Sequence, residues 1–222
     1  MQLNRIGQVR TCMKESYRVY SDGDDDSVRI NGTYDGQVSI RQTTNGTVVV
    51  AFRGTESWKD WMINLLRTRS QFPMIPGAMV HTGFQLQHDA LFDKIVAQLM
   101  LYHTLVPGIL VTGHSLGGAL ATLFAATIAR RMSTVNVVCF VFGSPRVGNR
   151  KFVKGLKRIQ NLSIVRINSA YDIIPCVPWM GYTHTAEVLT LSVKNTRWYQ
   201  VRKRHSIRCM YETFVGEHGS KL

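Results

Sequence analysis

Long hydrophobic runs are missing from this 222-residue sequence. No apolar run reaches the roughly 20 residues that cross a bilayer as a helix. The start, Met1-Gln2-Leu3-Asn4-Arg5, also lacks the apolar core of a signal peptide. We therefore expect the chain as given to be soluble, and either cytoplasmic or numbered without its secretion signal.

Cysteine is sparse and carries no motif spacing. None of the four cysteines, Cys12, Cys139, Cys176 and Cys209, forms a C-x-x-C pair, which leaves zinc and redox motifs unsupported. Cys139 lies in the apolar run 137–142 and is expected to be a small buried hydrophobe. Free thiols suit a reducing compartment, although an even count leaves disulfides open. No metal or organic cofactor is implied.

Acidic residues are scarce in the second half of the chain. Residues 1–115 carry 11 Lys or Arg and 10 Asp or Glu, whereas residues 116–222 carry 16 and 4, and the net charge is +13. The positive electrostatic field of this half would attract anionic lipid surfaces or nucleic acid. The alternative is that the excess only makes the protein surface basic and soluble. No nucleic acid partner is expected, because no binding motif with interleaved aromatics occurs. Peripheral contact with an anionic membrane surface remains open, and no signal bears on the oligomeric state.

The hydrophobic patterning predicts a single globular unit. A hydrophobic content of 45% with 18% charged residues fits one core, so we assign residues 1–222 to one domain. A Thr44-Asn45-Gly46 turn predicts a hairpin of strands 38–42 and 47–52. The remaining expected elements are helix 82–104, strand 109–114, helix 116–131, strand 135–143, helix 149–160, strand 162–168, two short strands in 186–201 and a helix near 205–216. This alternation predicts an α/β fold with a mostly parallel central sheet and helices on both faces.

The stretch Gly113-His114-Ser115-Leu116-Gly117 places a serine between two glycines. It follows the apolar run 109–112 and opens the apolar run 119–126, which is the pattern of a strand, a sharp turn and a helix. Such a turn exposes the serine hydroxyl and is too tight for side chains at the glycines. The pattern favours Ser115 as a nucleophile over a purely structural turn.

The order of acids and histidines after Ser115 selects its partners. Enzymes with this turn place serine, acid and histidine in that order, and Asp172 is the one aspartate that follows. It comes after the predicted strand 162–168, at the sheet edge where catalytic groups gather. Among the histidines, His205 is favoured as the base because it lies in the loop that leads into the last predicted helix. His184 is the competitor, with a pocket or packing role as its alternative.

A second group of residues, after the hairpin, predicts an oxyanion hole and a lid. Thr55, which leaves a strand through Gly54, can donate its N–H to an oxyanion, together with the N–H of Leu116 at a helix N-terminus. An apolar stripe at helical spacing follows and indicates either core packing or a lid that opens on lipid. The residues expected to form the lid or border the substrate are Trp58, Trp61, Met62, Leu65, His114 and His184.

A series of motifs resembles the class 3 (fungal-type) lipases of the α/β-hydrolase superfamily. The motifs are Phe52-Arg53-Gly54-Thr55, Asp60-Trp61, Asn64-Leu65, His81-Thr82-Gly83-Phe84, Thr112-Gly113-His114-Ser115-Leu116-Gly117-Gly118-Ala119, Phe142-Gly143-Ser144-Pro145-Arg146-Val147-Gly148-Asn149, Asp172-Ile173-Ile174-Pro175 and His205-Ser206-Ile207. They occur in family order and span about three-quarters of the chain. The resemblance implies Ser115, Asp172 and His205 as the triad. It also implies Thr55 and Leu116 as oxyanion donors. It places His184 near the site, but not as the catalytic base.

The expected activity is that of a carboxylic ester hydrolase acting on acylglycerols through an acyl-enzyme on Ser115. Lipids or small esters are therefore the expected substrates. A phospholipase A1 or galactolipase acting on anionic membrane lipids is the alternative enzyme. The alternative from another class is a catalytically silent, lipase-like binding protein.

Overall fold

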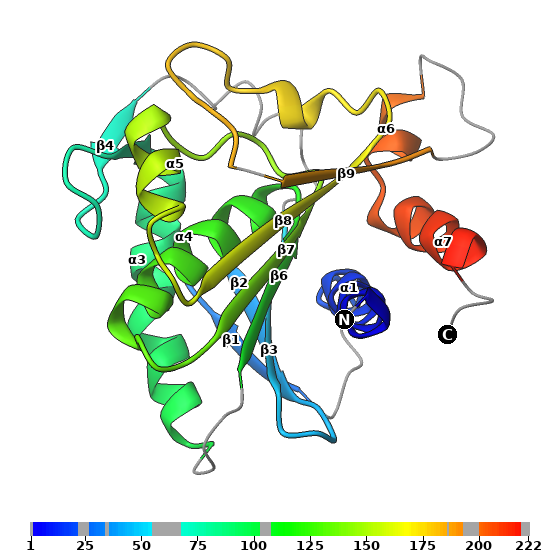
Figure 1. The fold of residues 1–222 in the computed structure, drawn as a ribbon, viewed down its shortest axis with the longest axis horizontal. Helices are drawn as coiled ribbons and strands as arrows, with labels where there is room; N and C mark the ends of the chain where they lie inside the picture. The colour runs from blue at the N-terminus through cyan, green and yellow to red at the C-terminus, as the bar shows by residue number, and fades with distance from the viewer. Residues whose placement is uncertain are drawn as a thin grey trace.

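The computed structural model describes residues 2–21, 27–33, 36–54, 68–102, 108–185, 187–192 and 200–218. Figure 1 shows their course. The strands are β1 (Val28–Asn31), β2 (Gln37–Gln42), β3 (Val48–Phe52), β4 (Arg69–Gln71), β5 (Met79–His81), β6 (Ile109–His114), β7 (Val137–Phe142), β8 (Leu162–Ser169) and β9 (Glu187–Leu191). The helices are α1 (Gln2–Arg18), α3 (Thr82–Met100), α4 (Leu116–Arg131), α5 (Arg150–Leu156), the 3₁₀ turn η1 (Ile174–Cys176), α6 (Val201–Arg204) and α7 (Ile207–His218).

Seven of the described strands form one sheet in the order β1-β2-β3-β6-β7-β8-β9. The first three strands pair antiparallel, and every pairing from β3 to β9 is parallel. This arrangement confirms the predicted mostly parallel sheet. Because β6, β7 and β8 run in one direction, the segments that follow them all leave from the same edge of the sheet.

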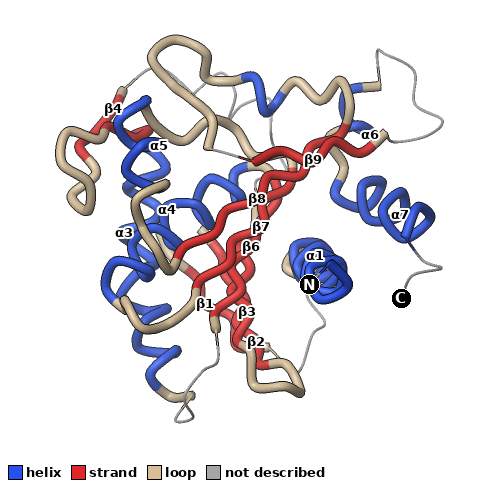
Figure 2. The backbone as a smooth tube through the Cα atoms, in the orientation of Figure 1, coloured by secondary structure: helices blue, strands red, loops and turns tan. Residues whose placement is uncertain are grey.

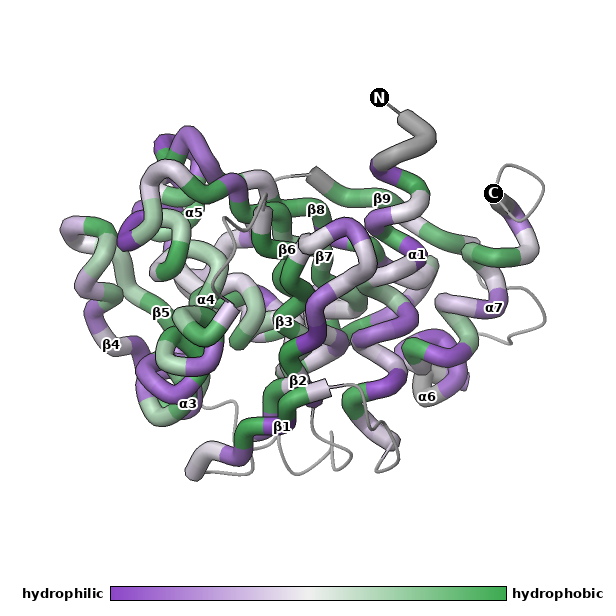
Figure 3. Tube along the Cα trace, turned by 90° about the horizontal axis from the view of Figure 1, so that it is seen from below, coloured by the Kyte–Doolittle hydropathy of each residue, from purple (hydrophilic) through white to green (hydrophobic). Residues whose placement is uncertain are grey.

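Helices cover both faces of this sheet, as predicted (Figure 2). Strand β3 shows how the sequence achieves this. Val48 and Val50 point into the core shared with α3 and α4, whereas Val49 lies between them in sequence and points into the core shared with α1 and α7. Side chains alternate between faces along a strand, so a continuous apolar run fills both cores. Figure 3 shows β3, β6 and β7 as a hydrophobic band through the molecule.

Helix α1 was not predicted from the sequence. Its residues Val9, Cys12 and Met13 are buried against the sheet, and the hydroxyl of Ser16 lies 2.8 Å from that of Thr112 in β6. The apolar positions at 6, 9 and 13 carry the three- and four-residue spacing of an amphipathic helix. This helix therefore fixes the start of the chain onto the strand that leads to Ser115.

The element boundaries depart from the predictions in a few places. The hairpin is confirmed, with Gln42 opposite Val48. The long helix ends at Met100 rather than at residue 104, and the helix expected over 149–160 ends at Leu156. After Leu156 the chain tightens into turns, in which the N–H groups of Arg158 and Ile159 bond to carbonyls three residues back. One of the two strands expected in 186–201 is β9, while residues 193–199 lie outside the described part of the chain. Among the described helices, none is long and apolar enough to cross a membrane.

Candidate active site

Ser115 forms the junction between β6 and α4. Its backbone has φ 56° and ψ −126°, a left-handed conformation for a residue with a side chain. Its N–H donates to the carbonyl of Phe142 across 2.9 Å, which ties the turn to the next strand. Backbone strain of this kind costs about 1–3 kcal/mol and is found mainly where function requires it.

The two glycines around Ser115 are required by close backbone approaches. A Cβ on Gly117 would stand 2.2 Å from the carbonyl oxygen of Phe52, and a Cβ on Gly113 would stand 2.3 Å from the backbone of Gly117. Both contacts are with backbone atoms, which cannot rotate away. The turn therefore excludes every side chain at these positions, as expected from the motif.

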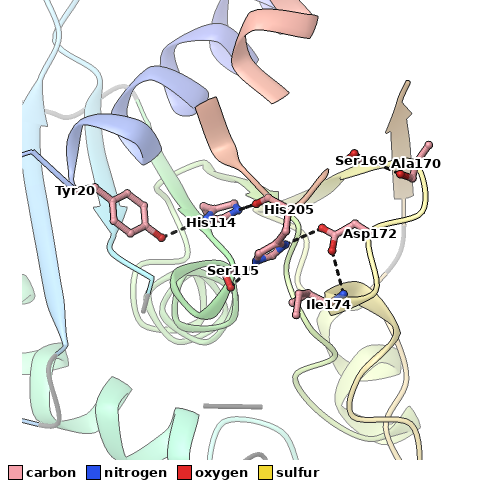
Figure 4. Close-up of polar contacts among 8 residues, drawn as sticks. All are labelled: Tyr20, His114, Ser115, Ser169, Ala170, Asp172, Ile174 and His205. Atoms are coloured by element: carbon pink, nitrogen blue, oxygen red, sulfur yellow. Dashed lines mark hydrogen bonds and ion pairs between the residues drawn. The ribbon is translucent and has the colours of Figure 1, made fainter. Parts of the chain in front are cut away.

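The three residues selected by their order in the sequence meet in one hydrogen-bonded chain (Figure 4). Nε2 of His205 lies 2.8 Å from Oγ of Ser115, and Nδ1 of His205 lies 2.7 Å from Oδ2 of Asp172. His205 lies between α6 and α7, whereas Asp172 follows β8. The structure thus brings together side chains that are up to 90 residues apart in sequence.

Asp172 is held in place and shielded from water. Its side chain has no exposed surface, and its Oδ1 accepts the N–H of Ile174 across 3.0 Å. An ionised carboxylate only accepts hydrogen bonds, so Nδ1 of His205 carries the proton in this contact. Nε2 is then left with a free lone pair directed at the hydroxyl of Ser115, which is the arrangement that a general base needs.

His114 takes part in a second hydrogen-bonded chain behind the first one. The hydroxyl of Tyr20 lies 3.2 Å from Nδ1 of His114, and Nε2 of His114 lies 2.5 Å from the backbone carbonyl of His205. The N–H of Gly54 donates to the same Tyr20 hydroxyl across 3.1 Å. Burial, with His205 as a second cause, lowers the pKa of His114 well below 6.5. The neutral ring donates from Nε2 to the carbonyl and accepts the Tyr20 proton at Nδ1.

This second chain was missed from the sequence. His114 was expected to border the substrate, but the ring is buried and both of its nitrogens have protein partners. Tyr20 carries no motif, and its place in the site depends on α1 packing against β6. The helical spacing of positions 6, 9 and 13, continued to residues 16 and 20, was the available signal.

Of the two predicted oxyanion donors, Leu116 lies within the described residues and Thr55 lies outside them. Leu116 is the first residue of α4, so its N–H has no acceptor within the helix. Thr55, Trp58, Trp61, Met62 and Leu65 lie outside the described residues. The chain leading to Thr55 does pass the site, since a Cβ on Gly54 would stand 3.4 Å from Cβ of Ser115.

His184 contacts the segment that carries Asp172. Its Nε2 donates to the backbone carbonyl of Pro175. Burial and the nearby guanidinium of Arg166 lower the pKa of His184 to about 4, so the ring is neutral at neutral pH. Within the described residues, the hydrogen bonds of Ser115 and Asp172 go to His205 and not to His184.

Comparisons with known proteins point to one family. The model of the family "Lipase (class 3)" matches residues 49–182. The chain is 28% identical over 200 residues to Phospholipase A1-II 1 of Oryza sativa subsp. indica, covering 78% of this chain and 51% of that protein. It is 28% identical over 176 residues to a lipase of Rhizomucor miehei, covering 76% of this chain and 48% of that protein. The solved structure of the Rhizomucor miehei triacylglyceride lipase superimposes with a TM-score of 0.73 at 25% identity, over 86% of this chain and 80% of that one.

The matches cover a larger share of this chain than of the curated relatives. The chain spans about half the length of the curated relatives it matches. The family match begins in β3 and ends in the segment after η1. It includes Ser115 and Asp172, while His205 lies beyond it.

Proposed function

The chain belongs to the class 3 lipase family, and on that premise we propose that it is a serine carboxylic ester hydrolase that cleaves acylglycerol esters. The observation that carries the proposal is the position of His205 between Ser115 and Asp172, at 2.8 and 2.7 Å. A serine hydroxyl attacks an ester only when a neighbouring base takes its proton. We further propose that residues 1–222 act as one α/β-hydrolase domain.

In the proposed acylation step, Oγ of Ser115 attacks the carbonyl carbon of the ester as its proton moves to Nε2 of His205. The carbonyl oxygen becomes an oxyanion, for which the N–H of Leu116 is one proposed donor and Thr55 the second. Asp172 stabilises the imidazolium that forms. When the tetrahedral intermediate collapses, the C–O bond to the alcohol breaks, and Nε2 returns the proton to the departing oxygen.

Deacylation repeats the same steps with water as the nucleophile. His205 takes a proton from the water, and the hydroxide attacks the acyl carbon. The bond to Oγ of Ser115 then breaks, and the serine recovers its proton from Nε2 as the fatty acid leaves. Water and the three side chains supply every proton and electron pair, so the proposed reaction needs no metal or organic cofactor.

A serine-reactive fluorophosphonate probe tests this proposal directly. We expect the probe to label the wild-type chain and to fail on Ser115→Ala, with Ser144→Ala as the control because Ser144 is another buried serine. Cleavage of a water-soluble short-chain ester should follow the same pattern. If the wild-type chain takes no label and cleaves no ester, the alternative of a catalytically silent binding protein is correct.

A second candidate, a phospholipase A1 that acts on anionic membrane lipids, has a specific observation in its favour. The similar rice protein carries the name phospholipase A1, and the chain has a net charge of +13, which would hold it at an anionic surface. A substrate panel separates the candidates. The first predicts faster release of fatty acid from triacylglycerol and monoacylglycerol, and the second predicts sn-1 release from phosphatidylglycerol with a 2-acyl lysolipid as product. Peripheral contact with an anionic membrane is part of the second proposal.

A further inference from the structure

The segment that carries Asp172 holds a concentration of exposed apolar side chains. Between β8 and β9, the exposed fraction is 79% for Tyr171, 76% for Trp179, 62% for Met180 and 42% for Ile173. Large apolar side chains are usually buried, and a cluster of exposed ones indicates a contact surface. We call residues 170–181 the apolar loop.

The apolar loop lies beside the candidate active site. Asp172, its third residue, bonds to His205, and Ile174 binds the other oxygen of the same carboxylate. In Figure 1 the segment between β8 and β9, coloured yellow to orange, runs along the edge of the sheet where β6, β7 and β8 end. A surface touching this loop would therefore lie next to Ser115.

Arginine side chains hold the loop from three parts of the chain, namely β4, the segment after β7, and α6. Arg204 donates to the carbonyl of Ala170 across 3.1 Å. Arg69 donates to the carbonyl of Gly181 across 3.2 Å. Arg146 adds a longer contact, 3.4 Å, to the carbonyl of Pro178. Because these contacts fix the backbone, the exposure of the loop's apolar side chains is a property of the fold.

The same arginines make the surroundings of the loop positive. Arg69 is exposed and Arg146 half-buried, whereas Arg204 is buried, with its guanidinium 4.8 Å from the ring centre of Tyr171. Asp172 is the one acidic residue between positions 94 and 186, and its side chain is buried. A membrane surface is apolar below its head groups and negative at them, so exposed apolar side chains beside an exposed arginine complement it.

We propose that the apolar loop is the surface by which the protein docks on anionic lipid, with Trp179 and Met180 entering the interface. This inference extends the proposed function, because docking there would place the ester bond of a bilayer lipid beside Ser115. Tryptophan suits the boundary between head groups and acyl chains, since its ring is apolar and its N–H is polar. Arg69, which is exposed and bonds to the carbonyl of Gly181 beside Met180, would bind lipid phosphates there.

Vesicle sedimentation tests the docking surface without hydrolysis when every chain also carries Ser115→Ala. The test variant is Trp179→Ser with Met180→Ser. The matched control is Met100→Ser with Leu101→Ser, a neighbouring pair with exposed fractions of 59% and 61%. That pair ends α3, which in Figure 1 ends at the opposite edge of the molecule.

We expect the parent chain to bind phosphatidylglycerol vesicles more tightly than phosphatidylcholine vesicles. The test variant should bind phosphatidylglycerol at least about tenfold more weakly, the effect of losing two buried apolar side chains. The control should stay within about twofold of the parent. Equal binding by test and control variants, equal binding to both lipids, or no vesicle binding by the parent would overturn the proposal. If the parent binds no vesicles, the exposed apolar side chains would instead indicate a contact surface for a protein.

A second assay separates this inference from the proposed function. In chains that keep Ser115, cleavage of a water-soluble ester should be the same for wild type and for the Trp179→Ser, Met180→Ser variant, which also shows that the variant is folded. If the wild-type chain does not cleave the ester, the proposed hydrolase activity is contradicted but the docking surface is not. Intact ester cleavage together with unchanged vesicle binding in the variant would contradict the docking surface alone.

Discussion

The hydroxyl of Tyr20 lies 3.2 Å from Nδ1 of His114, and this contact joins the turn that follows α1 to the candidate active site. Through His114 it reaches the backbone carbonyl of His205, and through the N–H of Gly54 it reaches the end of β3. One hydroxyl therefore touches both the segment that carries the proposed base and the segment that leads to the proposed oxyanion donor Thr55. We infer that Tyr20 is a positioning residue.

Replacing Tyr20 with Phe tests this role, because the ring stays and both hydrogen bonds are lost. Each such bond is worth about 0.5–1.5 kcal/mol, so we expect kcat for a soluble ester to fall by about tenfold while KM stays near the wild-type value. The control is Tyr17→Phe in the last turn of α1, where the side chain is 41% exposed. A lower melting temperature with unchanged kcat would show that Tyr20 only supports the fold.

The two competing histidines make opposite predictions when each is replaced with Ala. Loss of His205 removes the hydrogen bond to Ser115, so ester turnover should fall by a factor on the order of 10⁴. Loss of His184 removes a bond to the carbonyl of Pro175 and should leave turnover within about threefold of wild type. Single-turnover and steady-state rates on a soluble ester measure both. The reverse pattern would mean that His184 is the base.

The sheet and its site could be predicted largely because their signals are local or depend on chain order. Gly113 and Gly117 flank a serine within one turn, and the structure shows that their missing side chains make room for backbone atoms. Asp172 was selected as the one aspartate after Ser115, and a parallel sheet brings the ends of distant strands to one edge. Neither inference required knowledge of how the helices pack.

The remaining features depend on contacts between distant elements, which no local pattern encodes. Tyr20 reaches His114 only because α1 lies across β6. The exposure of Trp179 depends on a loop held by arginines from three other parts of the chain. The spacing of positions 6, 9 and 13 indicates an amphipathic helix, but it does not indicate that Tyr20 contacts His114 or that Trp179 is exposed.

Gly117→Ala should disrupt the fold at the serine turn. The added methyl group would stand 2.2 Å from the carbonyl oxygen of Phe52, which forces backbone movement and costs about 3 kcal/mol or more. The control is Gly7→Ala in α1, where a Cβ meets nothing within 4 Å and should stabilise the helix by about 0.5–1 kcal/mol. Urea unfolding measures both changes. Wild-type stability in Gly117→Ala would show that the turn has room for a side chain.

Acid should destabilise the protein through histidines that are buried as neutral rings. Burial first, and Arg166 second, lower the pKa of His184 to about 4, whereas the unfolded chain binds this proton near pH 6.5. Between these values the unfolded state holds more protons, so the free energy of unfolding falls as the pH falls from 6.5 towards 4. His184→Asn keeps a donor for Pro175 but cannot titrate, and it should flatten this slope. Urea unfolding at pH 8, 6, 5 and 4 compares the two chains, and parallel curves would show that His184 does not contribute to acid sensitivity.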